Sequence, residues 1–310
     1  MTRSVEALVE PPLLKWARES AHMSEAQAAS RLKVEVAKIQ AWESGAEKLT
    51  LAKLREVANV YKRPLAVFYL PEPPRDFSAM RDFRRIDGVD EPLSPDLAFQ
   101  LRRAQQRRAV ALELADMLGD NPPSFTARTS IEAGVEEAAR LAREALGVRA
   151  DEHLAIRDPG KAFNWWKGRA ETAGILVFET ERIAVEEMRG FSIAANVFPV
   201  IGVNGADASA GRIFSLAHEL GHLLLNEGGI CEFFERTSAE SQRIEVFCNG
   251  VAAELTMPRT VFLVDHTVRS TGREAWTHRL VSEVATRFSV SREAVLVRLQ
   301  TLNRIGVSVA

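Results

Sequence analysis

Apolar residues in the first seventy positions recur at helical spacing, in short blocks that are separated by tight turns. No part of this region alternates apolar and polar residues as a strand does. Ser24 is a suitable N-cap for EAQAASRL, Gly45 follows KIQAWES where a helix would stop, and Thr50 can cap LAKLREVANVY. The pattern predicts a small all-α unit that contains these three helices.

The pattern changes twice after that unit. Residues 71–95 are rich in proline and charge, which predicts a linker, and residues 95–118 and 130–147 then return to helical spacing. The β-rich runs GILVFET, GFSIA and VFPVIGV lie between Gly174 and Val203 and predict a small sheet. The helical segment Gly211 to Asn226, GRIFSLAHELGHLLLN, is almost wholly apolar and must pack against that sheet.

These elements predict a mainly α fold with a small β-sheet, of the α+β class. We expect a helical domain over 1–70, the linker over 71–95, a second domain over 96–265 and a helical module over 266–310. In the last module, LVSEVATRFSVSREAVLVRLQTLNRIG pairs two helices, the second of which Ser291 can cap.

Composition narrows the functional classes. The 310 residues are 46% hydrophobic and 26% charged, enough for two or three ordinary cores. No segment has the length and apolarity of a signal peptide or membrane span, so we expect a cytoplasmic protein without membrane contact. Cys231 and Cys248 lie outside any CxxC pattern and are expected to be buried thiols.

Charge is unevenly distributed, although the net charge is only −2. Residues 1–70 hold eleven Lys and Arg against eight Asp and Glu, and residues 266–310 hold seven against three. Any nucleic-acid contact therefore belongs to the ends. We interpret the four arginines of the 95–118 helix as a solvated face: Arg102, Arg103, Arg107 and Arg108.

The segment His218-Glu219-Leu220-Gly221-His222 carries the main candidate chemistry. Two histidines four residues apart lie on one helix face, where both imidazoles can bind one zinc ion. Glu219 is placed to act as general base on a water at the metal. The alternative is a pair of core histidines, but burying three such groups without a cation would be costly.

A catalytic zinc site needs a third protein ligand. The second helical run, SQRIEVFCNGVAAELTMP, offers Glu245, and Asn249 lies one turn farther on the same face. We interpret Glu245 as the ligand and Asn249 as a hydrogen-bond partner that orients a histidine ligand. Four other carboxylates remain competitors: Glu232, Glu235, Glu240 and Glu254.

The combination of HELGH, Glu245-x-x-x-Asn249 and VAAELTMP resembles the ImmA/IrrE family of gluzincin-like zinc metallopeptidases. The chain departs from that pattern at Phe247, Cys248 and Val251, which are packing positions. The resemblance implies a zinc enzyme, with manganese as a substitute in vitro, that cleaves or inactivates a helix-turn-helix repressor of a phage, mobile element or stress regulon. The oxyanion donor is unassigned, with His266 and His278 as weak candidates.

Residues 13–70 resemble an Xre/Cro-type helix-turn-helix domain, with SEAQAASRL and VEVAKIQAWESG as the motif helices. Glu35 stands where such a domain contacts DNA and would repel phosphate, so the expected donors are Lys33, Lys38 and Gln40. In the C-terminal pair, we expect Arg292, Arg298 and Arg304 to project from the last helix, with Arg292 and Arg298 as the candidate DNA contacts. Either module can instead serve only partner binding or packing.

Three functional hypotheses remain open at this stage. The first is a regulatory zinc peptidase acting on a helix-turn-helix repressor. The second is a DNA-binding regulator or antitoxin, with a toxin as partner, whose metal site is structural or sensory. The third is a partner-binding protein, a homodimer among the options. Glu219 favours the first, because a structural zinc site needs no general base.

Overall fold

The structure is a computed structural model and describes residues 5–74, 94–226, 229–231 and 239–306. The chain forms two compact units, residues 1–103 and 104–310. Most of the predicted 71–95 linker lies outside the described residues. No helix among the described residues is long and apolar enough to cross a membrane.

The first unit is helical, as predicted. It contains α1 (Pro11–Glu19), α2 (Glu25–Leu32), α3 (Val36–Glu43), α4 (Leu51–Val60) and a 3-10 turn (Leu65–Tyr69). Ser24 and Gln27 form a capping box at the start of α2, and Thr50 accepts a bond from Lys53 N, 3.2 Å away, at the start of α4. Gly45 follows α3 with φ +76°, which glycine adopts at low cost. The predicted caps and helix end are confirmed.

Helix α5 (Pro95–Leu118) carries the four arginines that were expected to form a solvated face. Arg102 donates to Ser20 O at 2.6 Å within the first unit, and burial lowers its pKa to about 10. Within the second unit, Arg108 donates to the carbonyls of Val197 and Phe198 at 3.0 and 2.8 Å. The prediction is therefore wrong for these two arginines, which hold backbone carbonyls.

A four-stranded mixed sheet forms the centre of the second unit. Its strands are β1 (Leu176–Thr180), β2 (Gly190–Ile193), β3 (Val200–Asn204) and β4 (Gly229–Cys231), in the order β1-β3-β2-β4. β1 pairs parallel with β3, and the other pairings are antiparallel. Every residue of β3 is buried, as expected for a strand covered on both faces. The sheet was predicted, whereas β4 was not.

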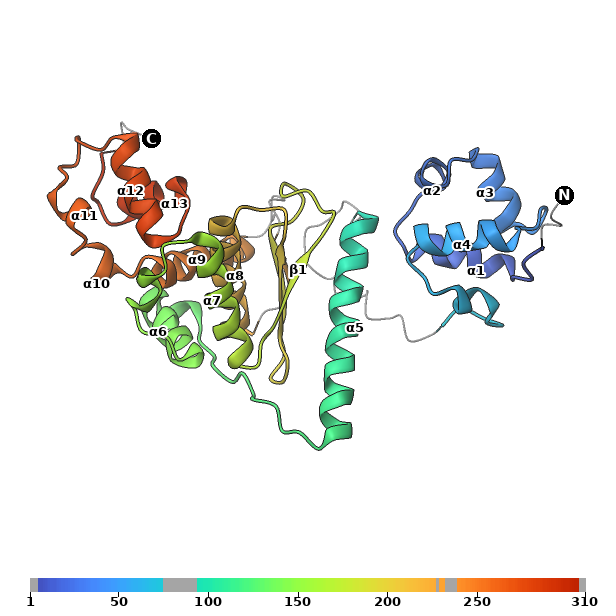
Figure 1. Ribbon diagram of the computed structural model, residues 1–310, viewed down its shortest axis with the longest axis horizontal. Helices are drawn as coiled ribbons and strands as arrows, with labels where there is room; N and C mark the ends of the chain where they lie inside the picture. The colour runs from blue at the N-terminus through green and yellow to red at the C-terminus, as the bar shows by residue number, and fades with distance from the viewer. Residues whose placement is uncertain (1–4, 75–93, 227–228, 232–238, 307–310) are drawn as a thin grey trace. The chain divides into compact units, whose positions relative to one another are not determined.

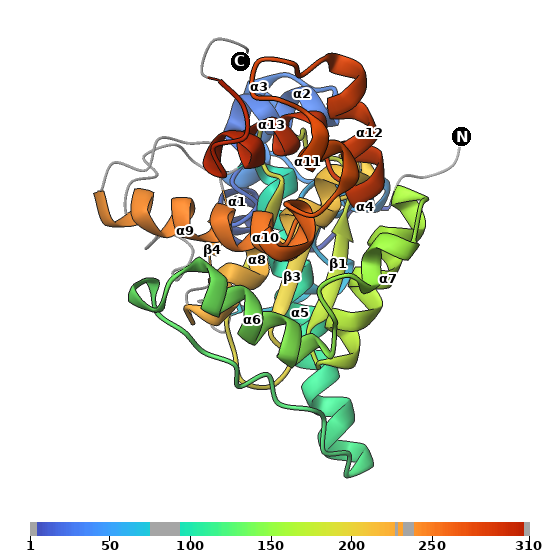
Figure 2. The ribbon, with the colours of Figure 1, turned by 90° about the vertical axis from the view of Figure 1, so that its left-hand side faces the viewer.

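Helices cover both faces of this sheet (Figure 1). On one face, α7 (Pro159–Thr172) and α8 (Ser209–Leu224) contact the strands, and α6 (Val135–Leu146) and α9 (Ala239–Thr256) pack against α8; residues of α5 from 104 onward lie on the other face. α6 and α9 lie side by side (Figure 2). The predicted 130–147 helix begins only at Val135, because Gly134 at φ +86° interrupts it.

The chain ends in a module of short helices: α10 (Arg259–Phe262), α11 (His266–Ser270), α12 (His278–Phe288) and α13 (Arg292–Thr301). The α12–α13 turn repeats the α2–α3 turn. Lys33 and Ser289, which end the first helix of each pair, both have a left-handed backbone with φ 54°. The backbone N–H of the residue after each donates to a carbonyl of the preceding helix at 3.0 Å. The predicted second helix-turn-helix-like pair is confirmed, with Ser291 as its cap. The fold is mainly α with a small sheet, as predicted.

Candidate metal centre

Helix α8 carries the HELGH segment into the core. Its residues from Ser215 to Leu224 are all buried, as expected for a helix that is apolar on every side. His218, Glu219 and His222 are 7%, 1% and 3% exposed. Three polar groups at this depth require compensating partners.

Helix α9 supplies the third donor. The Nε2 atoms of His218 and His222 are 3.2 Å apart, and Glu245 places its two carboxylate oxygens 3.2 and 3.4 Å from them. Glu245 is the most exposed of the three, with a side chain 22% accessible. The structure thus brings together His218, His222 and Glu245, the three residues predicted as ligands.

These separations suit zinc. Ligand atoms 2.0–2.1 Å from a tetrahedral ion lie about 3.4 Å from one another. The two Nε2 atoms match that edge, as does the distance from each of them to one of the two Glu245 oxygens, and two imidazoles with a carboxylate form a usual catalytic donor set. The residues present therefore fit a zinc ion, although its binding stays a prediction.

Asn249 lies behind the first histidine. Nδ1 of His218 donates to Oδ1 of Asn249 at 2.9 Å, which leaves the Nε2 lone pair of His218 directed at the cluster. Burial opposes protonation of His218, but the Glu245 hydrogen bond and the charges of Glu219 and Glu245 outweigh it and raise its pKa. Burial likewise opposes ionisation of Glu245, but both histidines lower its pKa. The cluster therefore favours a bound cation.

A glycine controls how closely α8 and α9 approach. A Cβ at Gly221 would lie 3.1 Å from Sγ and 3.2 Å from Cα and Cβ of Cys248. Since Gly221 lies between the two histidines, and Cys248 between Glu245 and Asn249, this contact sets the distance between ligands. The prediction that Cys248 is a buried thiol is confirmed; the side chain of Cys231 lies outside the described residues.

A second glycine makes room for the predicted general base. A Cβ at Gly190, in β2, would lie 2.6 Å from Oε1 of Glu219. Glu219 therefore occupies the space that a side chain at 190 would fill. Sequence analysis missed Gly190 and Gly221 in these roles, because each role depends on an element distant in the chain.

The competing carboxylates divide into three groups. Glu254 is buried at the other end of α9 and pairs with Arg298, and Glu240 is exposed in the first turn of α9. Glu232 and Glu235 lie outside the described residues. His266 and His278 are exposed at the starts of α11 and α12 and do not belong to the cluster.

A polar cluster that the sequence did not reveal closes the end of α9. Three side chains donate hydrogen bonds to backbone carbonyls there. Arg143 donates to Glu254, His153 donates to Thr256 at 2.9 Å, and Arg298 donates to Met257 at 3.1 Å. Arg298 is 5% exposed and also pairs with the Glu254 carboxylate. The prediction that Arg298 projects toward DNA is therefore wrong, because its guanidinium joins α13 to α9.

Arg304 also turns toward its own module. It is half-buried and donates to the carbonyl of Val268 at 2.7 Å, so it does not project freely as predicted. Arg292 is exposed at the start of α13. Of the three arginines expected to project from the last helix, only Arg292 has the expected exposure.

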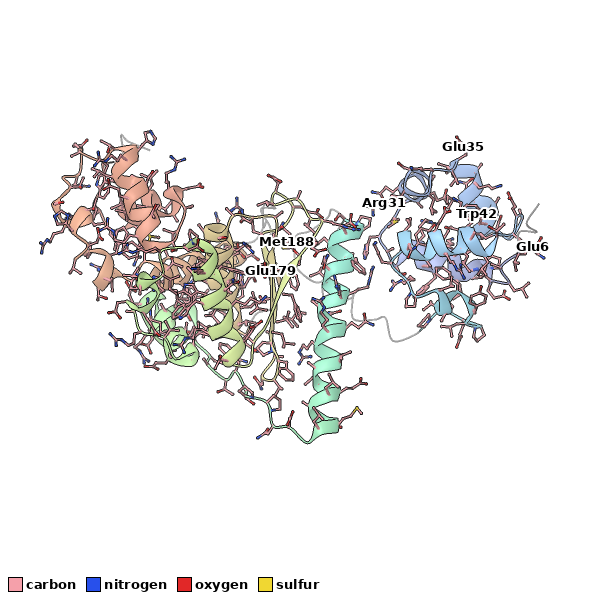
Figure 3. The ribbon with its side chains drawn as sticks, viewed as in Figure 1. Glu6, Arg31, Glu35, Trp42, Glu179 and Met188 are labelled. Atoms are coloured by element: carbon pink, nitrogen blue, oxygen red, sulfur yellow. The ribbon has the colours of Figure 1, made fainter. Side chains whose placement is uncertain are left out.

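The predicted DNA donors of the first unit are at its surface. Lys33 is the exposed C-cap of α2, Lys38 pairs with Glu47 at 2.5 Å, and Gln40 donates to Glu25 at 2.6 Å. Glu35 is the N-cap of α3, and Figure 3 shows it at the edge of the unit. Two of the three donors are thus held by acidic neighbours, and DNA contact stays a prediction.

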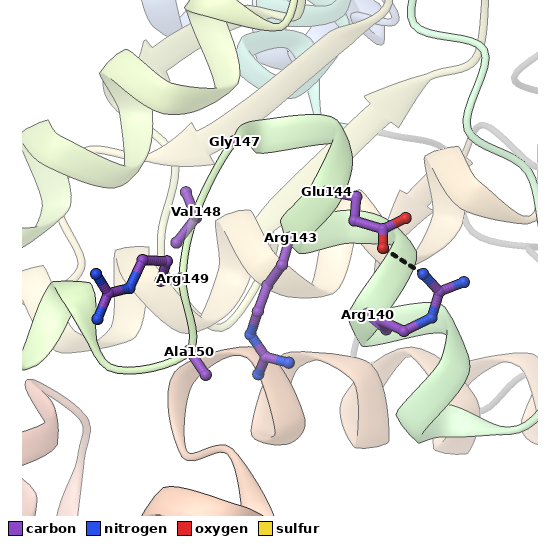
Figure 4. Close-up of a pocket in the computed structure, with 7 residues that line it drawn as sticks. All are labelled: Arg140, Arg143, Glu144, Gly147, Val148, Arg149 and Ala150. Carbon is purple, nitrogen blue, oxygen red and sulfur yellow. Dashed lines mark hydrogen bonds and ion pairs between the residues drawn. The ribbon is translucent and has the colours of Figure 1, made fainter.

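The second unit also has a shallow cavity of about 450 Å³ at the C-terminal end of α6 (Figure 4). It is lined by Arg140, Arg143, Glu144, Gly147, Val148, Arg149 and Ala150. None of these residues belongs to the histidine–carboxylate cluster, so the cavity is separate from the candidate metal centre.

The fold combines a helix-turn-helix unit with a domain in which an HExxH helix packs against a small sheet, as peptidase domains of the HExxH type do. Comparisons with family models give the same classes. Residues 170–300 match a family M78 peptidase model described as an IrrE N-terminal-like domain, and residues 14–68 match a helix-turn-helix model. No curated protein matches the chain significantly. Residues 170–300 are therefore similar to an IrrE-like peptidase-family domain and residues 14–68 to a helix-turn-helix domain, as the resemblance predicted.

Proposed function

We propose that the chain is a zinc-dependent regulatory metallopeptidase that cleaves a helix-turn-helix repressor. The observation that carries this proposal is the convergence of His218, His222 and Glu245 beside the buried carboxylate of Glu219. Within the described residues the cluster has three protein donors. A catalytic zinc site has three protein ligands and keeps its fourth coordination position open for water or substrate. A structural site usually fills that position with a fourth protein ligand.

When bound, zinc would polarise the scissile carbonyl and acidify a water molecule. His218 and His222 would hold the cation from α8, and Glu245 would hold it from α9. Glu219 accepts the proton of the attacking water and returns it to the leaving amine. The carboxylate of Glu219 lies in the space that Gly190 leaves free of a side chain. Asn249 keeps the imidazole of His218 in the tautomer that can bind metal.

The helix-turn-helix domain supports a regulatory substrate. We propose that it directs the peptidase to a repressor, by binding the same DNA or the repressor's own helix-turn-helix. A second candidate is a DNA-binding regulator or antitoxin with a sensory metal site, favoured by the two similar turns at α2–α3 and α12–α13.

The test uses the full chain with zinc and a helix-turn-helix repressor encoded next to its gene. We expect mass spectrometry to detect repressor fragments with the wild type and with Glu240→Gln, the exposed matched control on α9. Glu219→Gln should retain one zinc per chain but lose about 100-fold or more of the cleavage rate. Cleavage by Glu219→Gln, or none by the zinc-loaded wild type, would reject the peptidase proposal and favour the regulator.

A further inference from the structure

The cavity at the C-terminal end of α6 is lined by more cations than anions. Three arginines line it, Arg140, Arg143 and Arg149, against one carboxylate, that of Glu144. Figure 4 shows Arg143 between the other two arginines, with Glu144 turned toward Arg140. The cavity volume of about 450 Å³ falls within the range of small-molecule sites, about 300–1,000 Å³. The cavity therefore has the size for a small ligand and a lining of positive charge.

The outer two arginines differ in how far their charge is already compensated. Arg140 pairs with both Glu137 and Glu144, and so it is neutralised. The side chain of Arg149 is 81% exposed and lies 3.4 Å from a carboxylate oxygen of Asp151. An ion pair so exposed contributes little stability, so this guanidinium can turn to a ligand at low cost.

The central arginine, Arg143, is half-buried and poorly compensated. Its Nη2 donates to the backbone carbonyl of Glu254, and its Nε is buried without a hydrogen-bond partner among the described residues. Burial lowers the pKa of Arg143, and the nearby charges of Glu254 and Arg298 have opposite signs and pair with each other. A half-buried cation in these surroundings is costly without an anion. An anion in the adjacent cavity would supply the missing charge.

The backbone around the cavity opposes an anion only weakly. The C-terminus of a helix carries about half an elementary negative charge, and the N–H groups of Gly147 and Val148 already bond the last carbonyls of α6. The two guanidinium groups of Arg143 and Arg149 outweigh that partial charge. Gly147 also keeps the cavity open, because a Cβ there would have no atom within 4 Å.

We propose that this cavity binds a small molecule through a phosphoryl group, which Arg143 and Arg149 hold by charge-assisted hydrogen bonds. A phosphoryl group carries close to two negative charges and three acceptor oxygens, whereas a carboxylate carries one charge on two oxygens. Two arginines at one cavity therefore favour the phosphoryl group. The site is separate from the histidine–carboxylate cluster and goes beyond the proposed peptidase activity.

Isothermal titration calorimetry of the zinc-loaded full chain with inorganic phosphate tests the site. We expect saturable binding that weakens by roughly tenfold or more in Arg143→Gln and by roughly threefold or more in Arg149→Gln, since each variant loses a charge-assisted bond. Arg149 is exposed and holds no buried contact, so its variant remains informative even where Arg143→Gln fails to fold. Arg279→Gln is the matched control, because Arg279 is 86% exposed on α12, and it should bind phosphate like the wild type.

The outcomes that would overturn the proposal are distinct. Absence of saturable binding to the wild type would reject the site. An affinity that neither cavity variant changes would also reject it, because the phosphate would then bind elsewhere, as at the zinc ion. Sodium acetate should bind at least about tenfold more weakly than phosphate, and equal affinity would reject the phosphoryl assignment. None of these measurements depends on cleavage of a repressor, so they are independent of the test of the peptidase proposal.

Discussion

Replacing Gly221 with alanine tests how closely α8 and α9 must approach for the metal ligands to meet. The added methyl group would lie 3.1 Å from Sγ and 3.2 Å from Cα and Cβ of Cys248. Carbon atoms pack best about 3.5–4.0 Å apart, so the helices must separate by about 0.5 Å. Two of the three neighbouring atoms are Cα and Cβ, and a change of rotamer at Cys248 cannot relieve the contact.

Two consequences follow for Gly221→Ala. Overpacking a core costs about 1–3 kcal/mol, which for a unit of this size lowers the melting temperature by about 2–12 °C. The shift also moves Glu245 relative to the two histidines of α8. Because metal–ligand distances tolerate only about 0.2 Å, we expect zinc affinity to fall by roughly tenfold or more.

Competition with a chromophoric chelator measures the zinc affinity, and calorimetry measures the melting temperature. Gly168→Ala is the matched control: Gly168 is a helical glycine of α7 whose Cβ position has no atom within 4 Å. Alanine there should stabilise the protein by up to about 1 kcal/mol and leave zinc affinity unchanged. Wild-type zinc affinity in Gly221→Ala would refute the reasoning, because the helix contact would then not set the ligand distances.

Two predictions concern the polar cluster at the end of α9. Burial lowers the pKa of His153 below its usual 6.5. As the pH falls, this imidazole is therefore protonated in the unfolded chain at a higher pH than in the folded chain. The free energy of unfolding should therefore fall as pH drops below about 6.5, by up to about 1.4 kcal/mol per pH unit. Urea unfolding at a series of pH values measures this dependence, which should be weaker in His153→Gln. Arg298→Met leaves the carboxylate of Glu254 buried without its partner and should cost about 3–5 kcal/mol in the same assay. Arg298→Met/Glu254→Gln should recover much of this loss, and a double variant as unstable as the single one would show that the pair is not the cause.

Local signals in the sequence accounted for most of the helices and for part of the site. Helical periodicity and capping residues such as Ser24, Thr50 and Ser291 act within a few positions, so they can be recognised without the fold. The histidines of HELGH share a helix face for the same reason. The spacing from His222 favours Glu245 among the carboxylates, and the structure brings it to the two histidines.

Contacts between distant segments were not accessible in the same way. Arg298 looked like one more cation on a terminal helix, yet tertiary packing buries it against Glu254. The α7 helix and the β4 strand were missed. The former lacks a strong periodic pattern, and the latter is a three-residue edge strand held by pairing with β2.

The sequence by itself determined the mainly α class, the two helix-turn-helix pairs and the candidate metal ligands of α8, because these follow from periodicity and side-chain chemistry over a few turns. Only the tertiary structure decided which groups meet. It placed Gly221 against Cys248 and Gly190 against Glu219, it turned Arg298 inward, and it left one face of α5 exposed. The physical reason is that close packing is a relation between elements far apart in the chain, and neither element alone encodes it.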